Sequence, residues 1–239
     1  MDKALYTAMT AAKETEFRKS VNANNIANAS TDGFKKAVVA TKALEAHGVG
    51  HKSRSYAMTH KAGIDSSEGA IKFTQNKNDM TVRGDDWFVL DDGDGQYLSK
   101  NISYTLNPFG EMVTMNGSKI QTSQGGVLVP ESASVEVSSN GDIFFKMPQQ
   151  AQLVNVGQIE VVTAKSSEIQ KNAKGQVVSP NATRSVFPQI VTGALQQSNV
   201  SQVTLAMESM NLSNQFQMNM KVYKSVESMA DSTNRLIGN

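Results

Sequence analysis

The sequence predicts an α+β fold, with long N- and C-terminal helices packed as a coiled coil and a mainly antiparallel β domain between them. All five prolines and 16 of the 17 glycines fall between Gly33 and Gly193, so both ends can form long helices. In the middle, short β-branched runs alternate with Asp-Gly, Asn-Pro and Asn-Gly turn signals at intervals of about ten residues. We therefore expect a first helix over 1–32, a connector over 33–75, a β domain over 76–192 and a last helix over 193–239.

Composition narrows the function classes. The 239 residues carry 23 basic and 22 acidic side chains, a net charge of +1, which suggests neither nucleic acid nor an anionic membrane as a partner. Cysteine is absent, so disulfides and thiolate chemistry are excluded. No run of about 18 apolar residues is present to span a membrane. The start, Met1 to Leu5, has no basic-then-apolar pattern of the secretory kind.

The stretch VNANNIANASTDGFKK, 21–36, ends the first predicted helix with four asparagines, at 22, 24, 25 and 28. Asparagine is a poor helix former, but its amide both donates and accepts hydrogen bonds. Asn24, Asn25 and Asn28 can share one helix face and bridge to a neighbouring helix. The Ser-Thr-Asp-Gly turn at 30–33 then ends the helix, with Phe34 as an anchor. The alternative is a frayed terminus that is rich in turn formers.

The last helix has a heptad-like apolar seam, formed by Leu212, Phe216, Tyr223, Val226, Ala230 and Ile237. The first helix has a weaker stripe, formed by Leu5, Met9, Ala12, Ala23 and Ile26. From Gln197 to Met220 the only charged residue is Glu208, whereas an ordinary surface helix carries many charges. This pattern favours a helix covered on several sides in an assembly. The alternative is an isolated helical pair rich in Asn and Gln.

Two pieces of the β domain can be placed more closely. Residues 133–147, with Asn140-Gly141 as the turn, predict a hairpin, and residues 157–162 predict a further strand. The stretch 35–75 is less regular, and we expect it to connect the first helix to the β domain.

No catalytic, cofactor or metal motif is recognisable. Phosphate-binding loops and the G-x-S-x-G pattern are absent. The glycines between His47 and His51 argue against a helical metal pair, and His60 stands apart. Asp91-Asp92-Gly93-Asp94-Gly95 fails as a calcium loop because the Gly and Glu that an EF-hand needs are missing, so it predicts a tight hairpin turn. Asp85 and Asp86 have no identifiable partner for acid–base work.

Three ordered motifs resemble those of the bacterial flagellar rod and hook protein family. The stretch NNIANASTDGFKK, 24–36, resembles the family's N-terminal motif. TGALQQSNVSQV, 192–203, resembles its C-terminal signature, with Gln196 in place of the usual Glu and Ser201 in place of the usual Asn. VRGDDWFVLDDGDGQYLSKN, 82–101, resembles its central motif through Gly84, Asp85, Trp87, Phe88 and Tyr97, and Ser99 to Ile102 replace the usual Thr-Arg-Asn-Gly.

The resemblance implies a structural protein without catalytic activity, cofactor or metal. It implies a proximal-rod member of the family, exported without a cleaved signal through the flagellar type III apparatus. After export, it would polymerise with copies of itself and with other rod proteins into a helical shaft across the periplasm, with no membrane insertion. The terminal helices would line the tube and the β domain would lie outside. The assembly residues are then Asn24, Asn25, Asn28, Phe34, Ser198, Asn199, Val200, Leu212, Phe216, Tyr223 and Val226.

Two alternatives remain open. The nearest is a distal-rod member of the same family. The other is an extracellular adhesin or carbohydrate-binding β module, in which Trp87, Tyr97 and Tyr104 would form an exposed aromatic platform.

Overall fold

A computed structural model describes residues 3–45, 55–123, 125–130, 133–147 and 153–237. The chain divides into two compact units, one of residues 1–29, 37–63 and 200–239, and one of residues 30–36 and 64–199. The first unit contains both helices and the second contains most of the strands. Two long terminal helices and a central antiparallel β-sheet domain confirm the predicted fold class. The four predicted domain bounds stay a prediction.

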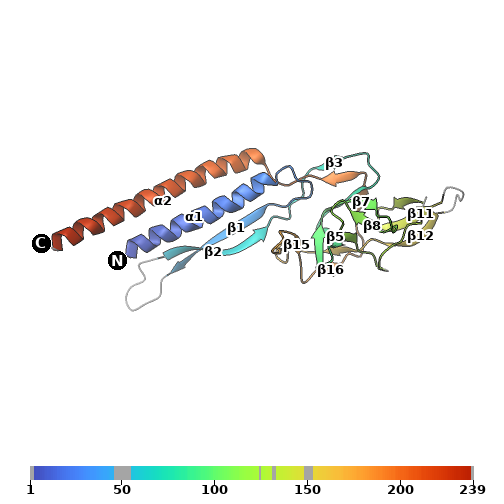
Figure 1. The fold of residues 1–239 in the computed structure, drawn as a ribbon, viewed down its shortest axis with the longest axis horizontal. Helices are drawn as coiled ribbons and strands as arrows, with labels where there is room; N and C mark the ends of the chain where they lie inside the picture. Colours follow the sequence, from blue (N-terminus) through green and yellow to red (C-terminus); the bar gives the residue numbers. More distant parts are fainter. Residues whose placement is uncertain (1–2, 46–54, 124, 131–132, 148–152, 238–239) are drawn as a thin grey trace. The chain divides into compact units, whose positions relative to one another are not determined.

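The first unit is built on helices α1 (Lys3–Ala27) and α2 (Gln202–Ile237), which pack side by side (Figure 1). α1 ends where the Asn-rich stretch begins its turn, and Gly33 follows in the left-handed region at φ 78°. α2 begins only at Gln202, after Ser201, whose hydroxyl accepts the N–H of Thr204 as an N-cap. Within the last predicted segment, 193–239, the helix occupies Gln202–Ile237.

The segment expected to be irregular contains two long strands, β1 (Ala37–Glu45) and β2 (Ser55–Ile64), which pair with each other. Glu14 of α1 fixes this pair, because its carboxylate accepts hydrogen bonds from the Thr41 hydroxyl and from the N–H and hydroxyl of Thr59. The description of residues 35–75 as less regular is wrong over these strands. A two-stranded pair is marginal alone, so its stability depends on packing against the helix.

The second unit contains the remaining strands, which are short because turns interrupt them. They are β3 (Ile71–Phe73), β4 (Asp79–Val82), β5 (Asp86–Asp91), β6 (Gln96–Ser99), β7 (Asn101–Leu106), β8 (Met112–Thr114), β9 (Lys119–Ile120), β10 (Ser134–Val137), β11 (Asp142–Lys146), β12 (Leu153–Gln158), β13 (Val161–Thr163), β14 (Gln170–Lys171), β15 (Val177–Val178), β16 (Thr183–Arg184), β17 (Ile190–Thr192) and β18 (Ala194–Gln196).

These strands form one large antiparallel sheet and two smaller ones. The large sheet has the order β14-β15-β6-β5-β9-β8-β7-β4-β17, with β13 paired to β5 and β16. β10, β11 and β12 form a second sheet, and β18 pairs with β3. The predicted hairpin is confirmed, since β10 and β11 are antiparallel around Asn140-Gly141. The predicted strand over 157–162 is instead divided between β12 and β13.

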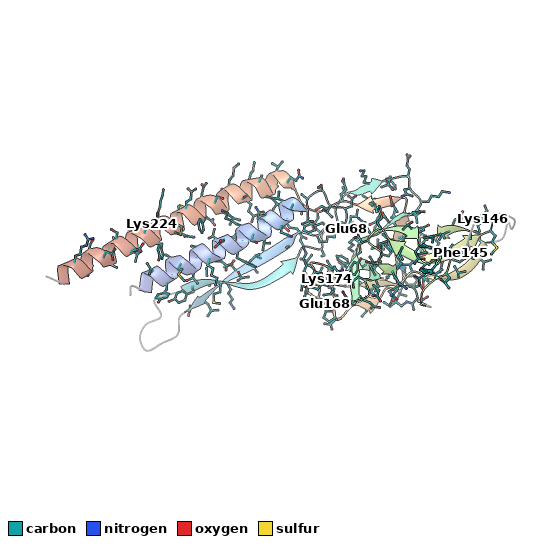
Figure 2. All side chains as sticks on the ribbon, viewed as in Figure 1. Glu68, Phe145, Lys146, Glu168, Lys174 and Lys224 are labelled. Atoms are coloured by element: carbon teal, nitrogen blue, oxygen red, sulfur yellow. The ribbon has the colours of Figure 1, made fainter. Side chains whose placement is uncertain are left out.

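β5 lies at the centre and is buried on both faces. Phe88 belongs to one hydrophobic core and Trp87 to another, because successive side chains of a strand point to opposite faces. Trp87 is only 1% exposed, so the exposed aromatic platform of the adhesin alternative is wrong. The same alternation places Phe145 in the core and the next residue, Lys146, in solvent (Figure 2).

Candidate assembly interface

The seam between α1 and α2 combines leucines with small residues. Leu205 and Leu212 are almost fully buried, and on α1 the buried apolar residues are Ala8 and Ala12. Phe216, Tyr223 and Val226, which the heptad spacing placed on this seam, are half-buried. The stripe predicted on α1 is partly wrong, since Met9 and Ala23 are exposed while Ala8 and Thr15 are buried. The short side chains on α1 allow the two backbones to approach closely.

Polar contacts recur along the seam. The Asn219 amide donates to the Thr15 hydroxyl at 3.2 Å, and Arg18 lies 3.9 Å from the Glu208 carboxylate. The Lys19 ammonium lies 5.5 Å from the centre of the Phe216 ring. Glu208, the single charge between Gln197 and Met220, therefore has its partner on α1.

The four asparagines of the opening motif have different surroundings. Asn25 is buried, and its amide donates to the carbonyl of Ala37 and accepts from the N–H of Ala37, both at 2.9 Å. Asn22, also buried, donates to the Leu205 carbonyl at 2.9 Å, and its own carbonyl oxygen has no partner among the described residues. Asn24 is exposed, and Asn28 donates to the Asn24 carbonyl.

The face of α2 that points away from the seam, here called the outer face, carries a row of large apolar side chains among polar ones. Its large side chains are 54% to 69% exposed, and they are Val203, Met207, Met210, Met218, Val222 and Met229. Exposed apolar patches of this kind mark interaction surfaces. Sequence reasoning recognised the lack of charge here but did not identify these methionines as a surface.

The three sequence motifs meet inside the second unit. The Asn101 amide donates to the Gln196 carbonyl at 2.8 Å and accepts the Gln196 N–H at 2.9 Å, and the N–H of Gly33 also reaches that carbonyl. The Lys35 ammonium donates to the Gln196 side-chain oxygen at 2.8 Å. We call these four residues the motif junction.

The rest of the C-terminal signature is also tied to this region. The Asn199 amide accepts the N–H of Lys36 and donates to the carbonyls of Asp65 and Ser67. Ser198 and Val200 are half-buried. Phe34 is half-buried beneath Lys171, whose ammonium lies 4.3 Å from the centre of the ring.

Two lysines near these motifs are buried. Lys35 is 2% exposed, and burial lowers the pKa of its ammonium, partly offset by the carboxylates of Glu68 and Asp65. Burial and the positive charge of Lys35 lower the pKa of Lys100 to about 8. Lys100 donates to the carbonyls of Gly84 and Asp86 and lies 4.2 Å from the Trp87 ring centre. Sequence reasoning missed Lys100, because a lysine in a turn motif is usually exposed.

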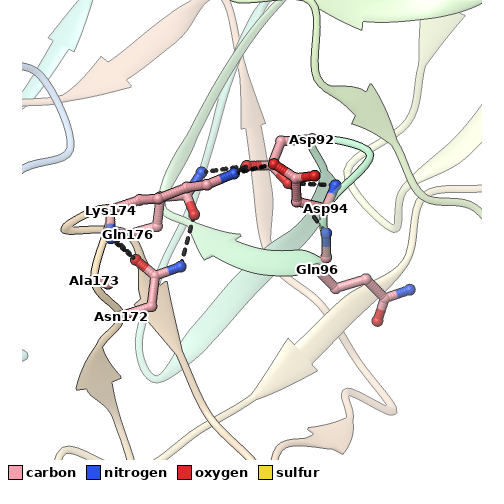
Figure 3. A pocket seen from close by; sticks show the side chains of 8 residues that line it. Asp92, Asp94, Gln96, Asn172, Ala173, Lys174 and Gln176 are labelled. Carbon is pink, nitrogen blue, oxygen red and sulfur yellow. Dashed lines mark hydrogen bonds and ion pairs between the residues drawn. The ribbon is translucent and has the colours of Figure 1, made fainter.

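The acidic turn forms one wall of a pocket of about 220 Å³ (Figure 3). Asp92 accepts the N–H groups of Asp94 and Gly95, as expected for a tight turn between β5 and β6. The Lys174 ammonium binds both carboxylates, at 2.8 Å from Asp92 and 2.6 Å from Asp94. These bonds hold the pKa of Asp92 below, and that of Lys174 above, their ordinary values. Lys174 therefore supplies the positive charge that binds the carboxylates of this turn.

Neither a cluster of metal-ligating side chains nor a membrane-spanning helix occurs in the described residues. These contain no group of three or more metal-ligating side chains, and no helix among them is long and apolar enough to cross a bilayer. His47 and His51 lie outside the described residues. Asp86 accepts from the hydroxyls of Thr163 and Ser185, a bridge between neighbouring segments of the β unit.

Comparison with known proteins matches both helical ends. A model of the flagella basal body rod protein family matches residues 5–35, and a model of the flagellar basal body rod FlgEFG protein C-terminal region matches residues 191–236. The chain is 30% identical to the flagellar basal-body rod protein FlgF of Escherichia coli, over 99% of both chains. It is 28% identical to FlgF of Salmonella typhimurium over the same share, and 28% identical to FlgG of Bacillus subtilis over 70% of this chain and 69% of that one. With its paired terminal helices and central β domain, the chain belongs to the flagellar basal-body rod protein family, a family of structural proteins rather than enzymes.

Proposed function

We propose that this chain is a subunit of the proximal rod, which assembles with copies of itself and with other rod proteins into a helical shaft that transmits torque and encloses the export channel. In this proposal the chain is exported by the flagellar type III apparatus without a cleaved signal. The 30% identity to an FlgF protein over 99% of both chains supports the proximal rod over the distal rod.

The single observation that carries the assembly role is the outer face of α2. A helix that is apolar both toward its partner helix and away from it needs further helices to cover it. The outer face has no charged neighbour between Gln197 and Met220 except Glu208, which is paired with Arg18. On α1, the exposed Tyr6, Met9 and Phe17 offer further apolar contact area, with the exposed Lys13 between them.

The proposed assembly residues then have two roles. Leu212, Phe216, Tyr223 and Val226 support assembly indirectly, because they hold α1 against α2. Asn25, Asn199 and Phe34 fix segments next to the helices. Asn25 bonds Ala37, Asn199 bonds the backbone at positions 36, 65 and 67, and Phe34 packs beneath Lys171. Asn24, which is exposed, remains available to a neighbouring subunit.

A charge on the outer face tests this role. We expect Met207→Glu combined with Met210→Glu to abolish swimming in a strain that lacks the chromosomal gene, because the assembly would have to bury two carboxylates. Met115→Glu is the matched control, since Met115 is also exposed, at 85%, but lies in the β unit. Wild type and the control should restore swimming and complete basal bodies. Swimming of the deletion strain itself would refute the rod role, and swimming of the double variant would refute the role of the outer face.

A further inference from the structure

Two sheets of the β unit lie next to each other, but among the described residues no strand of one pairs with a strand of the other. β10 is the last strand of its sheet, and β17 is the last strand of the large sheet. Both sheets surround one core, in which Ile143 and Phe145 of β11 pack with Met80 of β4 and Ile190 of β17. The edges of β10 and β17 are therefore neighbours beside this shared core.

A ladder between the two edges begins and then stops. The N–H of Ile190 donates to the carbonyl of Ser139 at 3.0 Å, as in an antiparallel pair. The next pair in that register is Thr192 with Val137. A pocket of about 430 Å³ opens there instead, lined by Val135 to Val137 on one side and by Thr192 and Gly193 on the other. We call this pocket the edge gap.

The backbone groups that point into the edge gap follow from the register. On β10, Ser138 bonds Asp142, so alternate residues bond β11, and Val135 and Val137 direct their N–H and C=O groups away from it. On β17, Gly193 bonds Asp79, which leaves Thr192 directed away from β4. No described residue bonds the backbone groups of Val135, Val137 or Thr192 on the gap side. Unpaired strand edges of this kind are templates for a further strand.

A strained residue lines the same gap. Gln75 has φ 61°, and among the described residues it is the only one besides glycine in the left-handed region. Its neighbour Thr74 is held on both sides, by its hydroxyl bond to Asp79 at 2.6 Å and by its N–H bond to the Gly193 carbonyl at 2.9 Å. Backbone strain that surrounding bonds maintain concentrates at functional sites. This observation is independent of the unpaired edges.

We propose that the edge gap accepts an extended segment of a second copy of this chain, which adds as a strand between β10 and β17. An extended backbone offers alternating donors and acceptors to both edges at once. The lining carries one cation, Lys77, and one anion, Glu136, so an added strand meets no net charge there. The inference rests on the proposed function, because an open helical assembly needs contacts in which one patch meets a different patch on the next copy.

Proline substitution removes the donors without removing the β10–β11 ladder. Val137→Pro and Thr192→Pro each delete an N–H that points into the gap, and proline is tolerated at strand edges. We expect each variant to be recovered in isolated basal bodies about tenfold less than wild type, with an unchanged melting temperature of the purified chain. Val137→Thr and Thr192→Val keep the N–H groups and the side-chain shape, and they are expected to behave as wild type. Normal recovery of both proline variants would overturn the proposal.

The source of the strand and the state of the empty gap can be tested separately. A photoactivatable benzoyl-phenylalanine at position 136 is expected to cross-link, in assembled rods, to a peptide of this same chain; capture of another rod protein would overturn the assignment to a second copy. The chain has no cysteine, so Val137→Cys with Thr192→Cys introduces a single pair. Rapid disulfide formation in the isolated chain would show that the edges close on each other, and would also overturn the proposal. Absence of wild-type chain from basal bodies would instead refute the rod function itself.

Discussion

The side chain of Asn25 holds both backbone groups of Ala37, the first residue of β1, with its amide as donor and acceptor at 2.9 Å. Asn25 is near the end of α1, so one amide fixes where the chain turns from the helix into the strand. Only asparagine or glutamine carries a donor and an acceptor on one side-chain amide, and the shorter one fits here.

Asn25→Ala is expected to lower the free energy of unfolding by about 1–3 kcal/mol, because it leaves the N–H and C=O of Ala37 without partners. Thermal unfolding of the purified chain measures this. Asn24→Ala, on the exposed side of the same helix, is the control and should change stability by less than about 0.5 kcal/mol. Equal melting temperatures for the two variants would contradict the assigned role of Asn25.

Gln196→Glu is expected to stabilise the chain by about 1 kcal/mol, because a carboxylate bonds the buried Lys35 ammonium more strongly than a neutral amide does. The Gln196 side-chain nitrogen has no partner among the described residues, so no hydrogen bond of that atom is lost. Gln196→Met, which leaves the ammonium with fewer partners, should destabilise the chain. A lower melting temperature for Gln196→Glu than for wild type would refute the expected ion pair.

The pKa of Lys100 predicts a dependence of stability on pH. The unfolded chain holds this proton up to its ordinary pKa of 10.5, whereas the folded chain releases it near pH 8. Between these pH values the unfolded state binds more protons, so stability rises with pH and falls again as the pH drops through that range. The contribution is at most about 3 kcal/mol.

Urea unfolding at pH 7.5 and pH 10 measures this slope. Lys100→Gln keeps a donor toward the carbonyls of Gly84 and Asp86 but removes the titrating charge, so its stability should rise less with pH than that of wild type. Since the pKa of Lys35 is lowered as well, a smaller rise should persist in the variant. Identical slopes would rule out a buried, titrating Lys100.

Leu212→Ala is expected to destabilise the helix pair by about 2–4 kcal/mol, since Leu212 is 2% exposed in the seam. Met210→Ala, two residues away on the outer face, should change stability by less than about 0.5 kcal/mol. Helical circular dichroism during thermal unfolding reports on both. A similar effect of the two substitutions would mean that the seam does not lie on the face assigned here.

Lys174→Ala is expected to raise the pKa of Asp92 toward its ordinary value, because Lys174 is the main cause of the depression. The carboxyl carbon shifts of Asp92 and Asp94, followed by NMR during an acid titration, measure the change. Gln176→Ala is the smaller perturbation, since Gln176 donates one weaker bond to Asp92 at 3.0 Å. An unmoved Asp92 titration in Lys174→Ala would contradict the ion pair.

The sequence by itself determined the features that depend on local pattern. The positions of glycine and proline separated the helical ends from the β middle, and Asn140-Gly141 located a hairpin. The 3-4 spacing placed Leu212, Phe216, Tyr223 and Val226 on the seam side of α2, because a helix repeats every 3.6 residues whatever it packs against. The ordered motifs identified the family.

Only the tertiary structure decided what each residue of those motifs contacts. The spacing grouped Asn24, Asn25 and Asn28 on one face, yet Asn25 bonds Ala37 and the buried Asn22 bonds Leu205, 183 residues along the chain. The weak stripe on α1 was misread because short residues such as Ala8 and Thr15 form the close contact, while the larger Met9 remains outside. Burial of Trp87 and Lys100 likewise depends on strands that sequence spacing does not bring together. The spacing of residues along a helix is a local property of the chain. The contacts of a side chain depend on long-range packing, and that packing decided what the motif residues bind.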